Sequence, residues 1–516
     1  MIFDPARFRR KAATAAKWAA LVAMAAVPRL AMMATVERRL DADESIVGLM
    51  AKHIAAGEGV PFFFYGQHYG GGHVIEALFA APLFKAFGPS EWAIHLSPVL
   101  FSVGIVLLVY TYMQRVYGGK AGLLAAALTA FSTPFLKSSL KADGYIETIF
   151  LGMAALMVAR LIEEAYRAGA GRRRMMLCAA LGVILGLAWW SYDFALIYAI
   201  ALIPVALRFG MLSVKGAVVF AGGFAVGAIP LIAANLSSDF AHINQLLSGS
   251  GGVKAIAQAP NALITMLVSE IPLFFSVDCV HNFVRPAPWH SWLTYSALIM
   301  SVVILAGRRR SVPGAPALVL AAAVVAYAAT GFAGKSPRYL LPLEPVISMA
   351  VAAALVLLFR TKRHISFFTG CVIFALAASG IIVGAAAVFS DNSIVEGNVK
   401  TDPESLVHVV EFLDESGVDC VHTTYFIKWR ILFLSDERIN AVDIRANERE
   451  TAYLRYEQAG CPPDEPGSYV FHNLSRHRYM LAAEINRVKA PYKVFYAEDH
   501  MAAIPALDEV FEESAR

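Results

Sequence analysis

Long apolar stretches, each near the roughly 20 residues that a helix needs to cross a bilayer, recur over most of this 516-residue chain. Across the whole chain 58% of the residues are hydrophobic and 16% are charged, whereas soluble domains carry about 25% charged residues. The sequence therefore predicts a polytopic α-helical membrane protein. The net charge of +4 comes from basic residues spread between the apolar stretches, so it does not indicate a nucleic-acid partner.

About eleven transmembrane helices are expected from these stretches. Clusters of basic residues, such as Arg172–Arg174 and Arg308–Arg310, fall in alternate loops, and the positive-inside rule makes that side cytoplasmic. The N-terminus then lies in the cytoplasm, and the loops 36–92 and 236–290 lie outside it. Arg38-Arg39 falls on the outer side and counts against the rule locally. The predicted spans are 15–35, 93–113, 121–136, 145–161, 176–190, 192–207, 213–235, 291–307, 314–333, 340–359 and 366–389.

The composition becomes polar after the last predicted span. We expect residues 1–392 to form the transmembrane domain and residues 393–516 to form a soluble, extracytoplasmic α/β domain. Alternating helical and strand patterns predict a small, partly parallel sheet there. This domain contains no phosphate-binding glycine loop, so a lid or a partner-docking role is expected. The patterned segments are 405–416, 418–423, 439–444, 448–458, 468–472, 476–489 and 492–497.

The chain contains five cysteines, and no spacing among them resembles a zinc site. Cys420 and Cys461 both lie in the predicted outer domain, where an oxidising compartment permits a disulfide between them. The distance between the two cannot be read from the sequence, so a bonded pair and a free pair both stay open.

An acidic run, Asp41-Ala42-Asp43-Glu44, follows the first predicted span. Behind it, Ile46 and Met50 share a helical face, and negative charges suit a helix N-terminus. The run therefore predicts the start of a short helix on the membrane surface. Asp41 is the expected N-cap, a role that is also open to Asp43. A second helix is expected after Gly70-Gly71-Gly72.

Short polar and aromatic motifs stand at the outer ends of the predicted spans and in the tail. They are Asp43-Glu44, Gly66–Gly70 and Glu76, then Leu140–Thr148, then Pro337–Pro342, and finally Thr424–Phe426 with Leu432–Ser435. In this order they resemble the first-loop pattern, the second outer loop, the late Arg-Tyr motif and an outer tail segment of GT-C glycosyltransferases. The similarity is to the family 39-like, protein-mannosyltransferase-related bacterial branch, and it covers most of the chain. It implies a GT-C-like transmembrane fold.

The resemblance also implies a reaction. In it, a sugar passes with inversion from a polyprenyl-phosphate donor to an acceptor at the outer face of the cytoplasmic (inner) membrane. The sequence does not identify the acceptor, which could be a lipid, a glycan or a protein. Such a transfer needs a base for the acceptor hydroxyl, and a carboxylate is suitable. By similarity Asp43 is that base, with Glu44 or Asp41 in support.

The leaving group of this reaction would be a lipid phosphate, which fixed cations stabilise. Arg338 is the strongest candidate, because arginine can grip a phosphate through two donors. Tyr339, Lys141 and Lys335 are further candidates. Anchoring at the membrane interface is the alternative for the cations, and we favour it for Lys335. The residues expected to contact the sugar or the acceptor are Gln67, His68, Tyr69, Glu76 and Asp143.

Metal dependence stays open. The spacing of His53, His68 and His73 matches no familiar pair of helical metal ligands. The sequence requires no cofactor, although some GT-C enzymes bind a divalent cation at their acidic loop.

The rival hypothesis is a transporter or flippase of a lipid-linked sugar, which would also need many spans. Transporters often contain internal repeats and broken helices that meet at the midplane. No convincing repeat is present here, and the polar motifs gather at the outer surface instead. A non-catalytic assembly protein is a third hypothesis.

Overall fold

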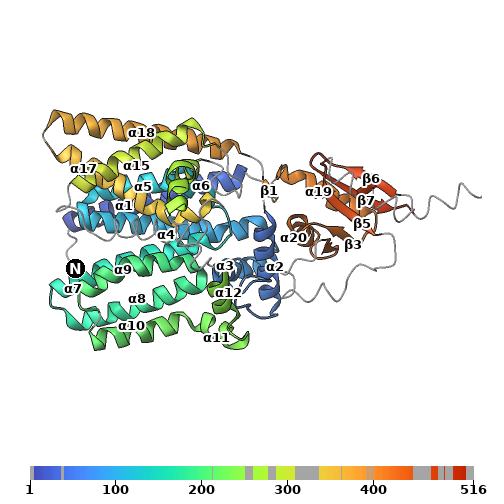
Figure 1. Ribbon diagram of the computed structural model, residues 1–516, viewed down its shortest axis with the longest axis horizontal. Helices are drawn as coiled ribbons and strands as arrows, with labels where there is room; N and C mark the ends of the chain where they lie inside the picture. The colour runs from blue at the N-terminus through green and yellow to red at the C-terminus, as the bar shows by residue number, and fades with distance from the viewer. Residues whose placement is uncertain are drawn as a thin grey trace, which may run out of the picture. The chain divides into compact units, whose positions relative to one another are not determined.

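The computed structural model divides into two compact units (Figure 1). The first comprises Met1–Thr35, His68–Ile75 and His95–Asp391. The second comprises Val36–Gln67, Glu76–Ile94 and Asn392–Arg516. The segments 36–67 and 76–94 therefore belong with the C-terminal residues, whereas the predicted domain boundary assigns them to the transmembrane domain. The residues that the structure describes are 5–35, 40–211, 213–249, 260–276, 286–307, 336–361, 363–391, 394–396, 399–444, 467–474, 481–482 and 492–506.

The first unit is built from helices. Among the described residues, seven helices of the chain are long and apolar enough to cross a membrane. Two further helices, bent by 64° at a short break, together provide an eighth candidate span. The prediction of a polytopic α-helical membrane protein is therefore confirmed. The elements are α1 (Pro5–Thr35), α4 (Glu91–Tyr117), α5 (Gly119–Phe131), α6 (Thr133–Ser138), α7 (Tyr145–Arg167), α8 (Gly171–Ser191), η1 (Asp193–Ala195), α9 (Leu196–Arg208), α10 (Val214–Gly227), α11 (Ile229–Ser237), α12 (Ala241–Gly249), η2 (Met266–Glu270), α14 (Ile271–Phe274), α15 (Trp289–Gly307), η4 (Pro337–Leu343), α17 (Glu344–Arg360) and α18 (His364–Ser390).

Two predicted spans are broken rather than continuous. The span predicted at 121–136 ends at Ser132, which is extended, and α6 follows with a proline in its first turn. The span predicted at 213–235 is the bent pair α10 and α11, and α11 also has a proline in its first turn. Proline lacks the backbone N–H that would continue the preceding helix, which explains both breaks. The span predicted at 314–333 lies outside the described residues, as does Arg38-Arg39.

Helices α8 and α10 lie side by side and approach closely at glycines spaced four apart (Figure 1). A Cβ atom added at Gly223 would lie 2.2 Å from the carbonyl oxygen of Ala179, and one added at Gly227 would lie 2.1 Å from that of Val183. Gly182 and Gly186 on α8 meet the backbone of α10 in the same way. Small residues at this spacing let membrane helices pack backbone to backbone.

The second unit contains a five-stranded sheet in the order β4-β3-β5-β7-β6 (Figure 1). Strand β3 pairs in parallel with β4 and β5, whereas β7 pairs antiparallel with β5 and β6. The predicted partly parallel sheet is therefore confirmed, although β7 and α20 were not expected. The elements of this domain are β1 (Ile394–Glu396), β2 (Val399–Thr401), α19 (Pro403–Glu415), β3 (Cys420–Thr423), α20 (Tyr425–Leu434), β4 (Asn440–Asp443), β5 (Ser468–His472), β6 (Tyr492–Tyr496) and β7 (His500–Pro505).

The predicted segments 448–458 and 476–489 lie outside the described residues, apart from the two helical positions 481–482. Cys420 takes part in a disulfide. Its predicted partner, Cys461, lies outside the described residues, so the predicted pairing stays a prediction.

The first outer loop forms the two predicted helices, α2 (Ala42–Ala56) and α3 (Gly71–Phe87). Asp41 caps α2, as predicted: its side chain accepts from the Glu44 amide at 3.0 Å, and the Glu44 side chain accepts from the Asp41 amide at 3.1 Å. Gly57 ends the helix in the left-handed region, with φ 84°. However, α2 is not an open surface helix, because Ala42 and every residue from 44 to 51 are buried by protein.

Candidate functional site

Asp43, the predicted base, belongs to the second unit and lies in the first turn of α2. Its Oδ1 atom accepts a hydrogen bond from the hydroxyl of Tyr425 at 3.2 Å. Tyr425 begins α20, so the acidic loop and the tail motif lie side by side although 382 positions separate them. Glu44, its predicted support, is buried and forms the capping box with Asp41, which is a structural role at the start of α2.

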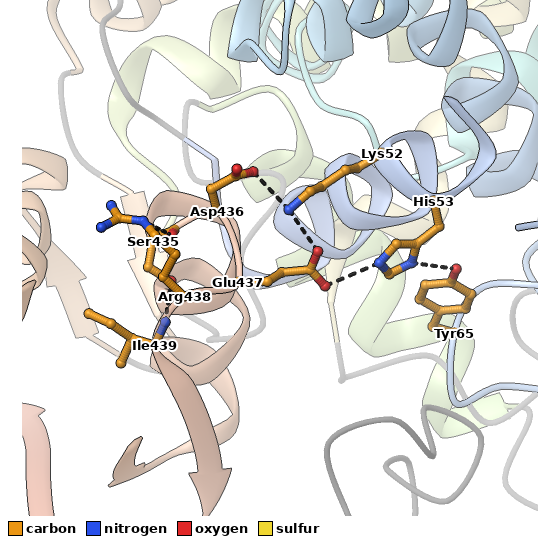
Figure 2. Close-up of polar contacts among 8 residues, drawn as sticks. All are labelled: Lys52, His53, Tyr65, Ser435, Asp436, Glu437, Arg438 and Ile439. Carbon is orange, nitrogen blue, oxygen red and sulfur yellow. Dashed lines mark hydrogen bonds and ion pairs between the residues drawn. The ribbon is translucent and has the colours of Figure 1, made fainter. Parts of the chain in front are cut away.

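Further along α2, two basic side chains meet the two acidic residues that follow α20 (Figure 2). Lys52 Nζ lies 2.7 Å from a carboxylate oxygen of Asp436 and 2.7 Å from one of Glu437. His53 uses Nε2 to contact Glu437 at 3.1 Å and Nδ1 to contact the Tyr65 hydroxyl at 3.0 Å. Burial alone would lower the pKa of Lys52, but hydrogen bonds with the two carboxylates outweigh it and raise that pKa.

Arg338, the predicted phosphate ligand, belongs to the first unit and lies in η4 among tyrosines. Its guanidinium carbon is 5.2 Å from the ring centroid of Tyr339 and 5.9 Å from that of Tyr145. Nη2 donates a long hydrogen bond of 3.4 Å to the Tyr339 hydroxyl. Within the described residues, the buried Nε atom has no hydrogen-bond partner. A buried donor in this condition is rare in proteins and is satisfied when a ligand oxygen approaches.

The tyrosines around Arg338 continue into a larger aromatic cluster of the same unit. The ring centroids of Tyr145 and Tyr192 are 4.9 Å apart, and their hydroxyl oxygens are 3.5 Å apart. The ring of Tyr192 also contacts that of Tyr69 edge to face, with 5.9 Å between the ring centroids, and its centroid lies 6.4 Å from that of His73. The predicted residues Tyr69, Arg338 and Tyr339 are thus joined through Tyr145 and Tyr192. We call these four tyrosines, Tyr69, Tyr145, Tyr192 and Tyr339, the tyrosine cluster.

Small residues bring two of the outer-loop motifs together at this cluster. A Cβ atom added at Gly72 would lie 2.6 Å from the carbonyl oxygen of Gly144 and 2.8 Å from Ser191 Oγ. One added at Gly71 would lie 2.5 Å from the ring of Trp190. Gly144 itself has a φ of 72°, which favours glycine. The glycine run of the first loop is therefore required for the second motif to approach.

The remaining predicted residues lie in both units. Asp143 is buried, and its Oδ1 accepts from the Tyr145 amide at 3.3 Å, so it supports the start of α7. Lys141, two positions before Asp143, is half-buried, and His68 is exposed. Asp143, Lys141 and His68 all belong to the first unit. Gln67 and the fully buried Glu76 belong to the second unit.

Gln67 Nε2 is buried and has no hydrogen-bond partner among the residues that the structure describes. A ligand oxygen would satisfy this donor, as at Arg338. Lys335 lies outside the described residues, so its predicted contact with phosphate is not described.

Tyr145 and Tyr192 were not singled out from the sequence as site residues. Tyr145 stood within the motif Leu140–Thr148. A signal was available for both tyrosines, because each borders a predicted span on the outer side. Asp193, the residue after Tyr192, accepts a hydrogen bond from Trp189 Nε1 at 3.1 Å, and its Oδ1 lies 3.0 Å from His242 Nε2. Over the described ranges, no group of three or more histidine, cysteine, aspartate or glutamate side chains is arranged to hold a metal ion.

Comparison with solved structures shows what this arrangement of helices is similar to. ArnT from Cupriavidus metallidurans in the apo state matches with a TM-score of 0.65 and 12% identity, over 95% of this chain and 98% of that chain. ArnT bound to undecaprenyl phosphate matches with a TM-score of 0.63 and 12% identity, over 94% and 97%. Archaeal oligosaccharyltransferase AglB from Archaeoglobus fulgidus, in complex with an inhibitory peptide and a dolichol-phosphate, is also similar. It matches with a TM-score of 0.52 and 13% identity, over 95% of this chain and 74% of that chain.

No protein-family model and no curated protein matches the sequence. At identities this low, the similarity to ArnT and AglB is one of fold. It extends over nearly the whole chain, and it confirms the GT-C-like fold that the motifs predict.

Proposed function

We propose that this protein transfers a sugar, with inversion, from a polyprenyl-phosphate donor to a lipid, glycan or protein acceptor. The observation that carries the proposal is that two structures with this fold hold a polyprenyl phosphate, undecaprenyl phosphate in ArnT and dolichol-phosphate in AglB. The chain itself supplies a matching feature, because Arg338 has a buried donor that no described residue satisfies. The reaction would take place at the outer face of the cytoplasmic membrane, with the N-terminus on the inner side.

In the proposed reaction, the bond between the anomeric carbon and the phosphate oxygen breaks, and a bond to the acceptor oxygen forms. Asp43 takes the proton of the acceptor hydroxyl, with Glu44 holding the start of α2. The phosphate leaves with the electron pair, and Arg338 stabilises its charge. Tyr339 and Lys141 support Arg338, and Lys335 is a further candidate in the same role.

The sugar and the acceptor would be held by the polar residues of the outer loops. Gln67 has a buried amide donor that a ligand oxygen would satisfy. Tyr69, a member of the tyrosine cluster, would contact the sugar or the acceptor, because aromatic side chains commonly line ligand sites and pack on the apolar face of the ligand. His68, Glu76 and Asp143 are the other proposed contacts. The proposed steps require no metal ion.

Reconstituted protein tests the proposal directly. Vesicles that contain the purified full-length chain would receive undecaprenyl-phosphate-linked hexoses and pentoses together with acceptor lipids, and mass spectrometry would detect transferred sugar. Transfer by the wild type and loss of about 10²–10⁴ in rate for Asp43→Asn are expected, because that range is typical of a missing general base. Full transfer by Asp43→Asn would show that the base is misassigned.

The same vesicles separate the enzyme from the rival transporter or flippase. An enzyme forms a new glycosidic product, and a flippase moves the intact lipid-linked sugar between leaflets. Movement of the donor without any product would therefore contradict the proposal. Assays with EDTA and with added Mg²⁺ or Mn²⁺ would settle metal dependence.

A further inference from the structure

Helices α2 and α20 of the second unit pair along their length and run in the same direction. The first contact joins Asp43 to Tyr425, which are 382 positions apart, and the last joins His53 to Glu437, which are 384 apart. A nearly constant separation in sequence means that the two segments run parallel. The ten-residue step from Asp43 to His53 spans about 15 Å of helix. These contacts therefore hold α2 at two places, one at the start of α20 and one at the turn that follows it.

The middle of this pair is held by close packing. A Cβ atom added at Gly48 would lie 2.5 Å from Phe433 Cε2, so only glycine lets the Phe433 ring lie this near the α2 backbone. The ring of Phe433 also packs against Phe84 at a centroid distance of 6.5 Å. Glycine at this position therefore sets the distance between α2 and α20.

The far end of the pair is held by charge. Asp436 and Glu437 both adopt the left-handed conformation, with φ of 53° and 63°, which residues other than glycine rarely adopt in succession. Strain of this kind persists where surrounding contacts over-determine the geometry. Here the turn directs the Asp436 carboxylate to Lys52, and the Glu437 carboxylate to both Lys52 and His53, as Figure 2 shows.

The near end carries the predicted base. Tyr425 is only 8% exposed, and its ring packs edge to face against Phe426 and Trp429, so its hydroxyl has a fixed direction. That hydroxyl donates to Asp43 Oδ1 at 3.2 Å. A donor on a carboxylate favours the ionised form and limits rotation of the group. Both effects suit a base that must be ionised and aimed before the acceptor binds.

We propose that Tyr425 is a positioning residue for Asp43 and that the C-terminal domain, through α20, completes the catalytic loop. This inference rests on the proposed function, in which Asp43 is the base. It gives the domain a role that differs from the lid or partner-docking role expected from the sequence. The domain holds a carboxylate of the first outer loop in its working state.

The test uses the full-length protein in vesicles with an undecaprenyl-phosphate-linked sugar. Tyr425→Phe removes one hydroxyl and keeps the ring packing. We expect kcat to fall by about tenfold with KM unchanged, since a hydrogen bond to a charged group is lost and 1.4 kcal/mol corresponds to a factor of ten. The acid limb of the pH–rate profile should move to higher pH, because the ionised carboxylate loses a donor. Tyr496→Phe, which removes a hydroxyl from the exposed Tyr496 of β6, should leave both unchanged.

A double-mutant cycle separates positioning from general loosening of the fold. In the Asp43→Asn background, Tyr425→Phe should have no further effect on the residual rate, because the two groups act as one unit. Glu437→Gln, which weakens the far end of the pair without touching Asp43, should lower kcat with KM unchanged.

A Tyr425→Phe variant with wild-type kcat and pH profile would overturn the inference, and so would additive effects in the cycle. Either result, together with an inactive Asp43→Asn, leaves the proposed function standing. Full activity of Asp43→Asn would instead remove the base assignment on which both depend.

Discussion

Arg338 gives the most direct measure of whether the tyrosine cluster surrounds a phosphate site. The guanidinium makes one long side-chain hydrogen bond among the described residues, 3.4 Å to Tyr339, and its buried Nε has no partner there. Its Nε donor is therefore one that a ligand oxygen could satisfy. Hydrogen bonds to charged groups contribute about 1.5–3 kcal/mol, so Arg338→Ala should weaken phosphate binding roughly 10- to 150-fold.

The assay is binding of undecaprenyl phosphate to the purified protein in detergent, measured by calorimetry or by native mass spectrometry. Arg338→Lys should fall between the wild type and Arg338→Ala, because lysine keeps the charge but loses the two-pronged donor geometry. Arg360→Ala is the matched control. It removes an arginine from the C-terminal end of α17, the 17-residue helix that follows η4, where Nη2 of Arg360 donates to the Tyr117 carbonyl at 2.7 Å.

The outcome that would refute this reasoning is specific. If Arg338→Ala bound undecaprenyl phosphate within about twofold of the wild type, the unsatisfied donor would not mark a phosphate site. If Arg360→Ala weakened binding equally, the loss at Arg338 would reflect a general effect of positive charge or of stability.

Two further predictions concern stability, and both are measured as apparent melting temperatures in detergent. Gly72→Ala should destabilise the protein by about 1–3 kcal/mol, because the added methyl meets the Gly144 backbone and overpacking costs that much. Its control, Gly222→Ala, adds a methyl to a helical glycine with open space around it, so it should be neutral or stabilise by about 0.5–1 kcal/mol; equal effects at both positions would contradict the close approach. For Lys52, the raised pKa means that stabilisation by its ion pairs is fully present below its ordinary pKa of about 10.4 and is lost as the pH rises above that value. The difference between the wild type and Lys52→Met should therefore be constant near neutral pH and should narrow above about pH 10.4; narrowing on the acid side alone would argue against these pairs.

Local patterns were enough for much of the fold. The cap at Asp41, the helix α2 and the strand at 468–472 each depend on residues within a few positions of one another. Long apolar runs likewise revealed most helices of the first unit. The breaks near Ser132 and Ala228 were missed because an apolar run looks the same whether its helix continues or bends. Pro134 and Pro230 carried the missing signal.

The candidate site was harder to predict from the sequence, because its contacts join residues that are far apart along the chain. Arg338 was expected to bind phosphate, yet nothing near it in sequence indicated that Tyr145 would pack on its guanidinium. That contact depends on how η4 and α7 come together, which hydropathy does not encode. The glycines that bring Gly72 to Gly144 were visible, but their partner was not.

Helix α20 shows why the tail domain seemed to lack chemistry. Its residues from 427 to 432 are all buried, so no apolar and polar faces alternate and no helical period is visible. Even its charged Arg430 is buried, where it donates to the Pro403 carbonyl at 3.1 Å. A helix whose central residues are all buried is stabilised by its tertiary partners, and one of those partners is α2. The pairing of Tyr425 with Asp43 therefore follows from the fold of the second unit, and a chain that lost α20 would keep its predicted base but lose the donor that holds it.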